Sequence, residues 1–278
     1  MSTNKLYRLA AFSDDASGGN PAGVWIGAEL PEPETMQKIA ADVGYSETAF
    51  VAPDSGTHRT IRYFSPESEV PFCGHATIAT GVQLGKLGGE GIYRLATKSG
   101  EVSVTARSHN GHNEASLVPV EPRHVSVSAD LLDQTLTLLG WKEGELDHSI
   151  PPATAYAGAW HLVLAVSKQD RLINLDYDFD GLKKLMLKED LTTLQLIWRE
   201  RPDLFHARNP FPVGGVFEDP ATGAAAADPG AARRAPGLRE RRATPGGSAT
   251  RGCCSRRTAC AAGRPPPRRA RSPGSRGG

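Results

Sequence analysis

The chain has 278 residues, enough for two modest domains, and its formal charge of +1 averages two unlike parts. Residues 1–227 hold 19 Lys and Arg against 29 Asp and Glu, whereas residues 228–278 hold 13 Arg against 2 acids. No apolar run approaches the length of a membrane span, and the first five residues lack the apolar core of a signal peptide. We therefore expect a cytoplasmic protein that does not enter a membrane.

Residues 1–122 are expected to form a first domain in which strands alternate with helices. Short strands are predicted at residues 23–27, 48–51, 60–64 and 102–105. Apolar residues recur at helical spacing over 36–43, and Gly44 is placed to end that helix. A second helix follows Gly74, and because residues 76–87 leave few charges on any face, we expect it to be buried.

From residue 123 the pattern begins again, which predicts a second domain over residues 123–227. Helices are predicted around residues 132–139 and 182–186, and strands at residues 161–166 and 194–198. A glycine-containing turn at 218–223 then opens an Ala-rich helix. Because each half runs through strands to such a turn, the pattern indicates internal duplication, with two helix N-termini aimed at one cleft.

Residues 228–278 are expected to be disordered, because Leu238 is the single large apolar residue among them. Arginine without lysine, among Pro, Gly and Ala, is typical of a GC-rich gene read out of frame. We hypothesise a frameshift near residue 227, which leaves the second domain incomplete. The alternative is a basic arm that binds nucleic acid through phosphates. The segment lacks the aromatic residues that stack on bases, so nucleic acid is not an expected partner.

The two predicted helix starts carry the polar residues that are best placed to bind a ligand. A helix N-terminus offers unpaired N–H groups and a positive dipole end, which bind carboxylates. Gly74 and Gly223 allow close backbone approach, and Thr77 and Thr222 add hydroxyl donors. Either turn alone is more simply an ordinary capped helix start. The pair favours a site for a small molecule that carries a carboxylate.

Four other residue types allow proton chemistry at these turns. Glu47 precedes a predicted strand. One interpretation is an ordinary exposed loop glutamate. The other is a glutamate in a closed cleft, where desolvation would raise its pKa and suit it to proton transfer. His75 is either a proton relay or a buried, hydrogen-bonded histidine. Cys73 is either an activated thiolate or, as we prefer, inert. Asp219 either caps a helix or faces Glu47 as a second carboxylate.

Cysteine spacing supports neither a disulfide framework nor a zinc site, and we expect no metal. Cys73 is the one cysteine before the basic segment, and the other three lack paired Cys or His spacing.

Four short motifs occur in one order along the chain. They are GNPAGV at 19–24, SETAF at 46–50, PFCGHAT at 71–77 and EDPATG at 218–223. In this order and spacing they resemble the PhzF (phenazine-biosynthesis) family, over about residues 6–227. The resemblance implies an α+β, diaminopimelate-epimerase-like fold: two similar domains, each a curled, mostly antiparallel sheet around a central helix, with the active site between them.

The resemblance also implies a homodimeric isomerase without a cofactor, which moves a proton on a small carboxylate-bearing substrate by general acid/base catalysis. The family's acid/base glutamate falls on Glu47, its site histidine on His75 and its site aspartate on Asp219. Substrate-binding positions are expected at Asn20, Cys73, Gly74, Thr222, Gly223 and Ala224. Ala224 stands where many members have Ser, which removes one hydroxyl contact. A non-catalytic small-molecule binder on the same fold is the alternative function.

Overall fold

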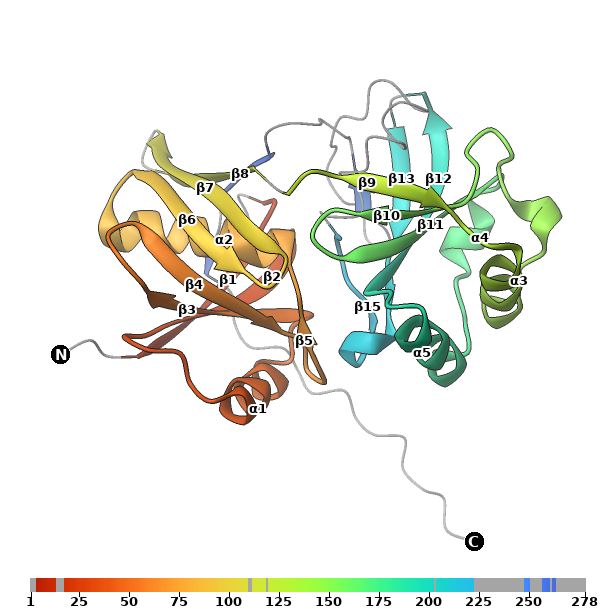
Figure 1. Ribbon diagram of the computed structural model, residues 1–278. Helices are drawn as coiled ribbons and strands as arrows, with labels where there is room; N and C mark the ends of the chain where they lie inside the picture. The colour runs from red at the N-terminus through yellow and green to blue at the C-terminus, as the bar shows by residue number, and fades with distance from the viewer. Residues whose placement is uncertain are drawn as a thin grey trace, which may run out of the picture.

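Two β-sheets lie side by side in the structure, a computed structural model, with helices packed against each (Figure 1). The structure describes residues 4–13, 18–109, 112–118, 120–202 and 204–222, with the short segments 248–250, 257–260 and 262–263. Most neighbouring strands are antiparallel, and few helices accompany them. The expected α+β class is confirmed.

The first sheet is curled so far that its two ends meet. Its strands are β1 (Lys5–Ala11), β2 (Asn20–Ile26), β3 (Glu47–Pro53), β4 (His58–Phe64), β5 (Glu69–Val70), β6 (Gly91–Thr97), β7 (Gly100–His109), β8 (His112–Val118), β17 (Arg257–Cys260) and β18 (Ala262–Gly263). They run in the order β17-β8-β7-β6-β4-β3-β2-β1-β18, with β5 beside β4. One residue separates β17 from β18 in the chain, yet the two strands pair at opposite ends of this order.

Helix α2 (Gly74–Gly88) lies inside this curl and contacts strands on several sides of it (Figure 1). Every residue from 74 to 84 is buried, which confirms the prediction of a buried central helix. Two glycines let the helix approach β7 closely. A Cβ atom at Gly81 would lie 2.4 Å from Cγ2 of Val104, and one at Gly85 would lie 2.8 Å from Cβ of Ala106.

Helix α1 (Pro33–Val43) packs on the outer face of the same sheet, where the predicted amphipathic helix was expected. Its buried side chain Met36 joins a cluster with Trp25. The helix ends at Gly44, whose φ of 68° is left-handed and whose N–H donates to the carbonyl of Ala40 over 3.0 Å. The predicted helix end is confirmed.

The second sheet has helices on one face. Its strands are β9 (Arg123–Ser126), β10 (Ala153–Tyr156), β11 (Trp160–Val166), β12 (Thr193–Arg201), β13 (Leu204–Arg208) and β16 (Ser248–Thr250), in the order β16-β13-β12-β11-β10-β9. The helices are α3 (Ala129–Leu138), α4 (Asp170–Ile173) and α5 (Phe179–Lys188). Short elements complete this half: η1 (Glu143–Glu145), β14 (Pro210–Phe211), η2 (Pro212–Gly214) and β15 (Val216–Glu218). Leu162 and Leu164 pack with the helices, while Val163 and Ala165 are buried on the opposite face.

The two halves repeat one arrangement of strands and helices. In the first, β2 and β3 are parallel and joined through α1; in the second, β11 and β12 are parallel and joined through α4 and α5. An antiparallel strand precedes each pair and another follows it. Glu47, the first residue of β3, pairs with Ala22, and Thr193, the first residue of β12, pairs with His161. The indicated duplication is therefore visible in topology, although the helix expected after Gly223 lies outside the described residues.

The basic segment at 228–278 holds short strands rather than irregular chain wherever the structure describes it. β16, β17 and β18 have three, four and two residues, and they pair with β13, β8 and β1. For these residues the expectation of disorder is corrected, because edge strands with unpaired backbone groups accept further strands whatever their side chains. The rest of the segment lies outside the described residues.

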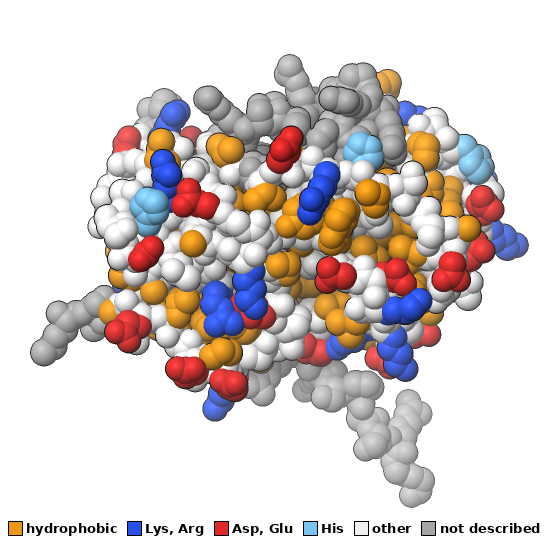
Figure 2. Space-filling view, in the orientation of Figure 1, with side chains coloured by type: hydrophobic (Ala, Val, Ile, Leu, Met, Phe, Trp, Pro, Cys, Tyr) orange, Lys and Arg blue, Asp and Glu red, His pale blue; other side chains and the backbone are white. Residues whose placement is uncertain are grey.

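Charges of both signs are interspersed on the face of the molecule that Figure 2 shows. Ion pairs in the described part of the chain include Arg62 with Glu69 at 2.7 Å and Arg208 with Glu218 at 2.6 Å. The described part of this face therefore has no large patch of charge of a single sign. None of the helices in the described ranges has the length and apolar character needed to cross a membrane.

We predict that Leu162→Ala lowers the free energy of unfolding by about 2–5 kcal/mol, because it opens a cavity beneath α5. Leu162 is completely buried, whereas Leu187 on α5 is 59% exposed. The matched change Leu187→Ala is expected to shift stability by less than about 0.5 kcal/mol. Urea unfolding of the full chain measures both, and equal losses for the two variants would contradict the described core.

Candidate active site

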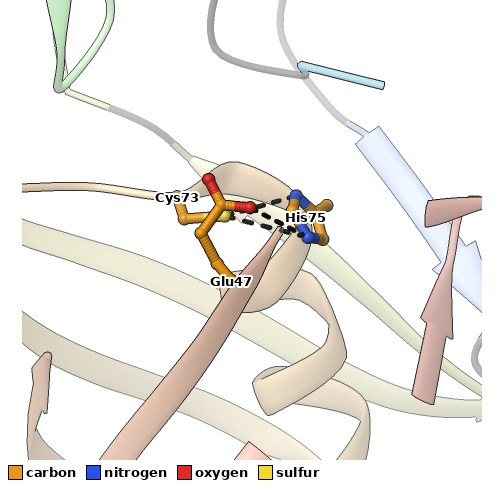
Figure 3. A group of neighbouring side chains, drawn as sticks. All are labelled: Glu47, Cys73 and His75. Carbon is orange, nitrogen blue, oxygen red and sulfur yellow. Dashed lines mark hydrogen bonds and ion pairs between the residues drawn. The ribbon is translucent and has the colours of Figure 1, made fainter. Parts of the chain in front are cut away.

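Three buried side chains meet where β3 begins and α2 begins (Figure 3). Glu47 is the first residue of β3, Cys73 directly precedes α2 at its N-cap position, and His75 lies in the first turn of that helix. Oε2 of Glu47 lies 3.5 Å from Nε2 of His75, and Sγ of Cys73 lies 3.2 Å from Nδ1 of His75. Two expected catalytic residues and one expected binding residue are thus brought together.

The first turn of α2 is fixed from its buried side. Cys73 has an extended backbone, with φ of −142°, and no side chain caps the helix start. The hydroxyl of Thr77 donates to the carbonyl of Cys73 over 2.6 Å and also contacts the hydroxyl of Tyr63 at 2.6 Å. Because these bonds use Thr77 inside the core, that residue does not offer the donor to a ligand that the sequence had indicated. Gly74, the first helical residue, lies where it was expected.

Glu47 is held in surroundings that favour its neutral form. Burial raises the pKa of Glu47 well above its ordinary value, and the nearby charge of Asp219 raises it further. The Ser46 hydroxyl and the Cys73 thiol oppose this rise without cancelling it. A raised pKa makes the carboxylate of a glutamate a stronger base, which suits Glu47 to proton transfer.

The other two groups of the cluster are also uncharged at neutral pH. Burial lowers the pKa of His75, against the opposing effect of the Asp219 charge. Burial, and next the charge of Glu47, raise the pKa of the Cys73 thiol. Cys73 is therefore a thiol and not an activated thiolate.

Asp219 comes from the second half and is 2% exposed, directly after β15. The side-chain amide of Asn20, at the start of β2, donates to Oδ1 of Asp219 over 2.7 Å and to the carbonyl of Ala221 over 3.0 Å. The hydroxyl of Thr222 donates to Oδ2 over 2.6 Å. Both carboxylate oxygens thus accept a hydrogen bond, which fixes the group in place.

Asn209 is a residue of this site that the sequence motifs did not include. Its side-chain amide donates to the carbonyl of Asp219 over 3.1 Å, and the N–H of Asp219 donates to the carbonyl of Asn209 over 2.9 Å. A polar residue between two short strands, just before Pro210, was the available signal. Of the expected binding residues, Asn20 and Thr222 are placed here, while Gly223 and Ala224 lie outside the described residues.

Several buried oxygens at this place lack a hydrogen-bond partner in the described part of the chain. They are Oε2 of Glu47, Oδ1 of Asn20 and Oδ1 of Asn209. Most buried polar atoms in proteins have partners, so this concentration indicates a place that accommodates a polar ligand. Because these atoms come from both halves, a ligand that bound all of them would lie between the two sheets.

The same cluster has the residue types of a metal site, although no metal was expected. One ligand atom each from Glu47, Cys73 and His75 lies within 4.8 Å of the others. Metal ligation needs an ionised carboxylate and thiolate. The raised pKa values of Glu47 and Cys73 favour protonated groups instead, so the cluster fits proton transfer better than metal binding.

Comparisons with known proteins identify the family of this chain. The sequence profile of the phenazine biosynthesis-like protein family, PhzC-PhzF, matches residues 9–231. An uncharacterised isomerase of Deinococcus radiodurans is 31% identical over 226 residues, 80% of this chain and 73% of the relative. The trans-2,3-dihydro-3-hydroxyanthranilate isomerase of Pseudomonas fluorescens is 31% identical over 231 residues, 78% of this chain and 75% of the relative.

Solved structures show the same fold at lower identity. A predicted epimerase of Pseudomonas aeruginosa superposes with a TM-score of 0.74 at 19% identity, covering 94% of this chain and 99% of that one. A PhzF-family protein of Bacillus anthracis gives 0.66 at 24% identity, covering 83% and 79%. The epimerase-like fold expected from the four motifs is confirmed.

We predict that Glu47→Gln becomes increasingly stable relative to the wild type as the pH rises from about 4.5 to 7. Above pH 4.5 the unfolded chain loses the Glu47 proton while the folded protein keeps it, so the unfolded state binds fewer protons and wild-type stability falls. Glutamine does not titrate. The difference should grow by up to about 1.4 kcal/mol per pH unit, as measured by urea unfolding.

The control for this titration is Glu34→Gln, the same chemical change at an exposed position of α1. The same pH series on this variant measures what the loss of an exposed carboxyl group does by itself. A level difference for Glu47→Gln would contradict the raised pKa.

Proposed function

This chain belongs to the phenazine biosynthesis-like (PhzC-PhzF) protein family, and we propose that it is an isomerase that moves a proton within a small carboxylate-bearing substrate by general acid/base catalysis. The observation that carries the proposal is the carboxyl group of Glu47, which is buried, has a raised pKa, and has no hydrogen-bond partner for Oε2 among the described residues. The named isomerases among its relatives support the reaction class.

Glu47 is the group that takes the proton and returns it. Its carboxylate removes a proton from a substrate carbon, and the electron pair of that C–H bond moves into the adjacent unsaturated system. The carboxylic acid then gives the proton to another carbon of the same molecule, where a new C–H bond forms. Atoms and electrons balance within the substrate, so the step requires neither an oxidant nor a reductant.

His75 and Asp219 assist this proton transfer, each through the carboxyl group of Glu47. The imidazole of His75, 3.5 Å from Oε2 of Glu47, orients the carboxyl group and polarises the substrate. The Asp219 charge helps to keep the pKa of Glu47 raised, which strengthens its carboxylate as a base. Asn20 and Thr222 hold Asp219 in place for this role.

The substrate carboxylate is proposed to lie at the start of α2. That helix end carries no side-chain cap, and its first residue is Gly74, which lets a ligand approach the backbone closely. The Pseudomonas fluorescens relative is named for trans-2,3-dihydro-3-hydroxyanthranilate, a cyclic amino acid with such a carboxylate. It is the first compound to test. Because Ala224 stands where many family members have Ser, other small carboxylates should be tested as well.

We predict that Glu47→Gln lowers turnover at least about a hundredfold, because general acid/base groups contribute that much or more. The assay incubates trans-2,3-dihydro-3-hydroxyanthranilate with the full chain in deuterated water and follows deuterium entry and isomerisation by NMR. Glu34→Gln serves as the control and should retain wild-type turnover. Full activity of Glu47→Gln would remove Glu47 from the mechanism.

The same assay separates the isomerase from a non-catalytic binder on this fold. Binding of the compound by the wild type, without deuterium entry or isomerisation, would favour the binder. Exchange that depends on Glu47 excludes it.

We also propose that the sequence after residue 227 arises from a shifted reading frame. The family match ends at residue 231, close to the change in composition, which supports this proposal. Translating the neighbouring frame of the gene should yield apolar, strand-like sequence. Thermal unfolding should then show a higher Tm for the frame-restored protein than for the 278-residue chain. A neighbouring frame without such sequence would contradict the proposal.

A further inference from the structure

A second polar cluster lies in the second sheet, away from the motifs that the family resemblance covers. His161 on β11 and Thr193 and Gln195 on β12 are 2%, 1% and 4% exposed. They share one face of the sheet with Val163 and Ile197, the face opposite the covering helices. Burying polar side chains on an otherwise apolar face costs free energy unless they form hydrogen bonds, so their presence here calls for an explanation.

The duplication places this cluster at the counterpart of Glu47. Thr193 begins β12 as Glu47 begins β3, and each pairs in parallel register with a residue near the start of the preceding strand. That residue is His161 in the second half and Ala22 in the first. In the first half this position holds a methyl group beside the proton-transfer carboxyl; in the second it holds an imidazole.

The chain just before His161 lies against the start of α2. Gly158 packs on the ring of Phe72, where an added Cβ atom would lie 2.4 Å from ring carbon Cδ1. Ala157 is buried in the same core cluster as Phe72 and Cys73. The Ser99 hydroxyl donates to the carbonyl of Gly158. These contacts bring the first residues of β11 to the Glu47 side of the molecule.

Asp219 lies close enough to influence both histidines. Burial lowers the pKa of His161 to about 4, and the charge of Asp219 opposes that effect, as it does for His75. His161 is therefore neutral at pH 7, with one ring nitrogen as donor and the other as acceptor. The charge of Asp219 thus acts on a histidine from each half of the molecule.

One nitrogen of the imidazole is engaged and the other is not. Nδ1 of His161 lies 2.7 Å from the hydroxyl of Thr193. Nε2 of His161 and Oε1 of Gln195 have no hydrogen-bond partner among the described residues. If the Thr193 hydroxyl donates to Nδ1, the neutral ring carries its proton on Nε2, as a donor to an incoming oxygen.

We propose that His161 is a substrate-binding residue of the Glu47 site, whose Nε2–H donates a hydrogen bond to a substrate oxygen. Thr193 is its positioning residue, since it fixes the tautomer and the ring plane. The inference rests on the proposed function, because the substrate that His161 would bind is the one on which Glu47 is proposed to act. The substrate would then contact both sheets, with Glu47 as the proton-transfer group on the first and His161 as a neutral hydrogen-bond donor on the second.

The test measures binding separately from turnover. Binding of anthranilate, a stable cyclic amino acid with a carboxylate, is followed by titration calorimetry on the full chain. The KM and kcat for trans-2,3-dihydro-3-hydroxyanthranilate are measured alongside. We expect His161→Ala to raise the Kd and KM by roughly tenfold or more, while kcat changes by less than about threefold, as for a lost binding contact.

Two further variants separate a binding role from a structural one. His161→Gln keeps an N–H donor near the position of Nε2 and should restore the Kd to within about threefold of the wild type. Thr193→Val keeps the volume but loses the hydroxyl, and should raise the Kd by an intermediate factor. His148→Ala, at an exposed histidine, is the matched control and should leave the Kd unchanged.

The outcomes distinguish this inference from the proposed function. Wild-type Kd and KM in a folded His161→Ala would overturn the inference while leaving Glu47 catalysis standing. A lower Tm with unchanged Kd, or failure of His161→Gln to restore binding, would assign His161 to the core and also overturn it. Full activity of Glu47→Gln, with weakened binding by His161→Ala, would instead overturn the proposed function alone. A wild type that binds neither compound would overturn both.

Discussion

The burial of one carboxyl group beside another is the constraint from which the rest of the site follows. Glu47 has a raised pKa because it is desolvated and because the charge of Asp219 lies nearby. The effect of the Asp219 charge requires the two halves to pack together, since Glu47 comes from one half and Asp219 from the other. The Asp219 charge is accommodated in turn by donors on both of its oxygens. A site open to water would lose the raised pKa and, with it, the proposed chemistry.

The duplicated fold supplies two equivalent positions that carry different chemistry. Glu47 and Thr193 begin corresponding strands, and Ala22 and His161 lie opposite them. One half therefore offers a titrating carboxyl, and the other offers a neutral imidazole held by a hydroxyl. Two opposed acids would suit a reaction that inverts one carbon. One proton-transferring carboxyl, with Asp219 held in place by hydrogen bonds, suits the return of a proton to a different carbon of the same substrate, as proposed.

Local patterns were enough to predict the helices α1, α2, α3 and α5, but not the short α4, and they also supplied the residues of the motifs. The helix α1 and its end at Gly44 follow from apolar spacing and from glycine's tolerance of positive φ, both of which act within a few residues. The buried character of α2 follows from its lack of charge on any face. Glu47, His75 and Asp219 lie in short motifs whose order is itself a sequence property, so the resemblance could assign them.

Contacts between residues far apart in the chain were beyond the reach of such patterns. Asn20 and Asp219 are 199 residues apart, yet they share a hydrogen bond. Asn209 and His161 read as ordinary polar residues beside apolar strands, and they become site candidates because packing buries them next to Asp219 or near the start of α2. The strands within 228–278 were missed for the same reason, since pairing at a sheet edge depends on backbone groups and not on side-chain pattern. Residue types and spacing thus specify which groups are available for proton chemistry, while burial and long-range pairing specify which of them meet and at what pKa.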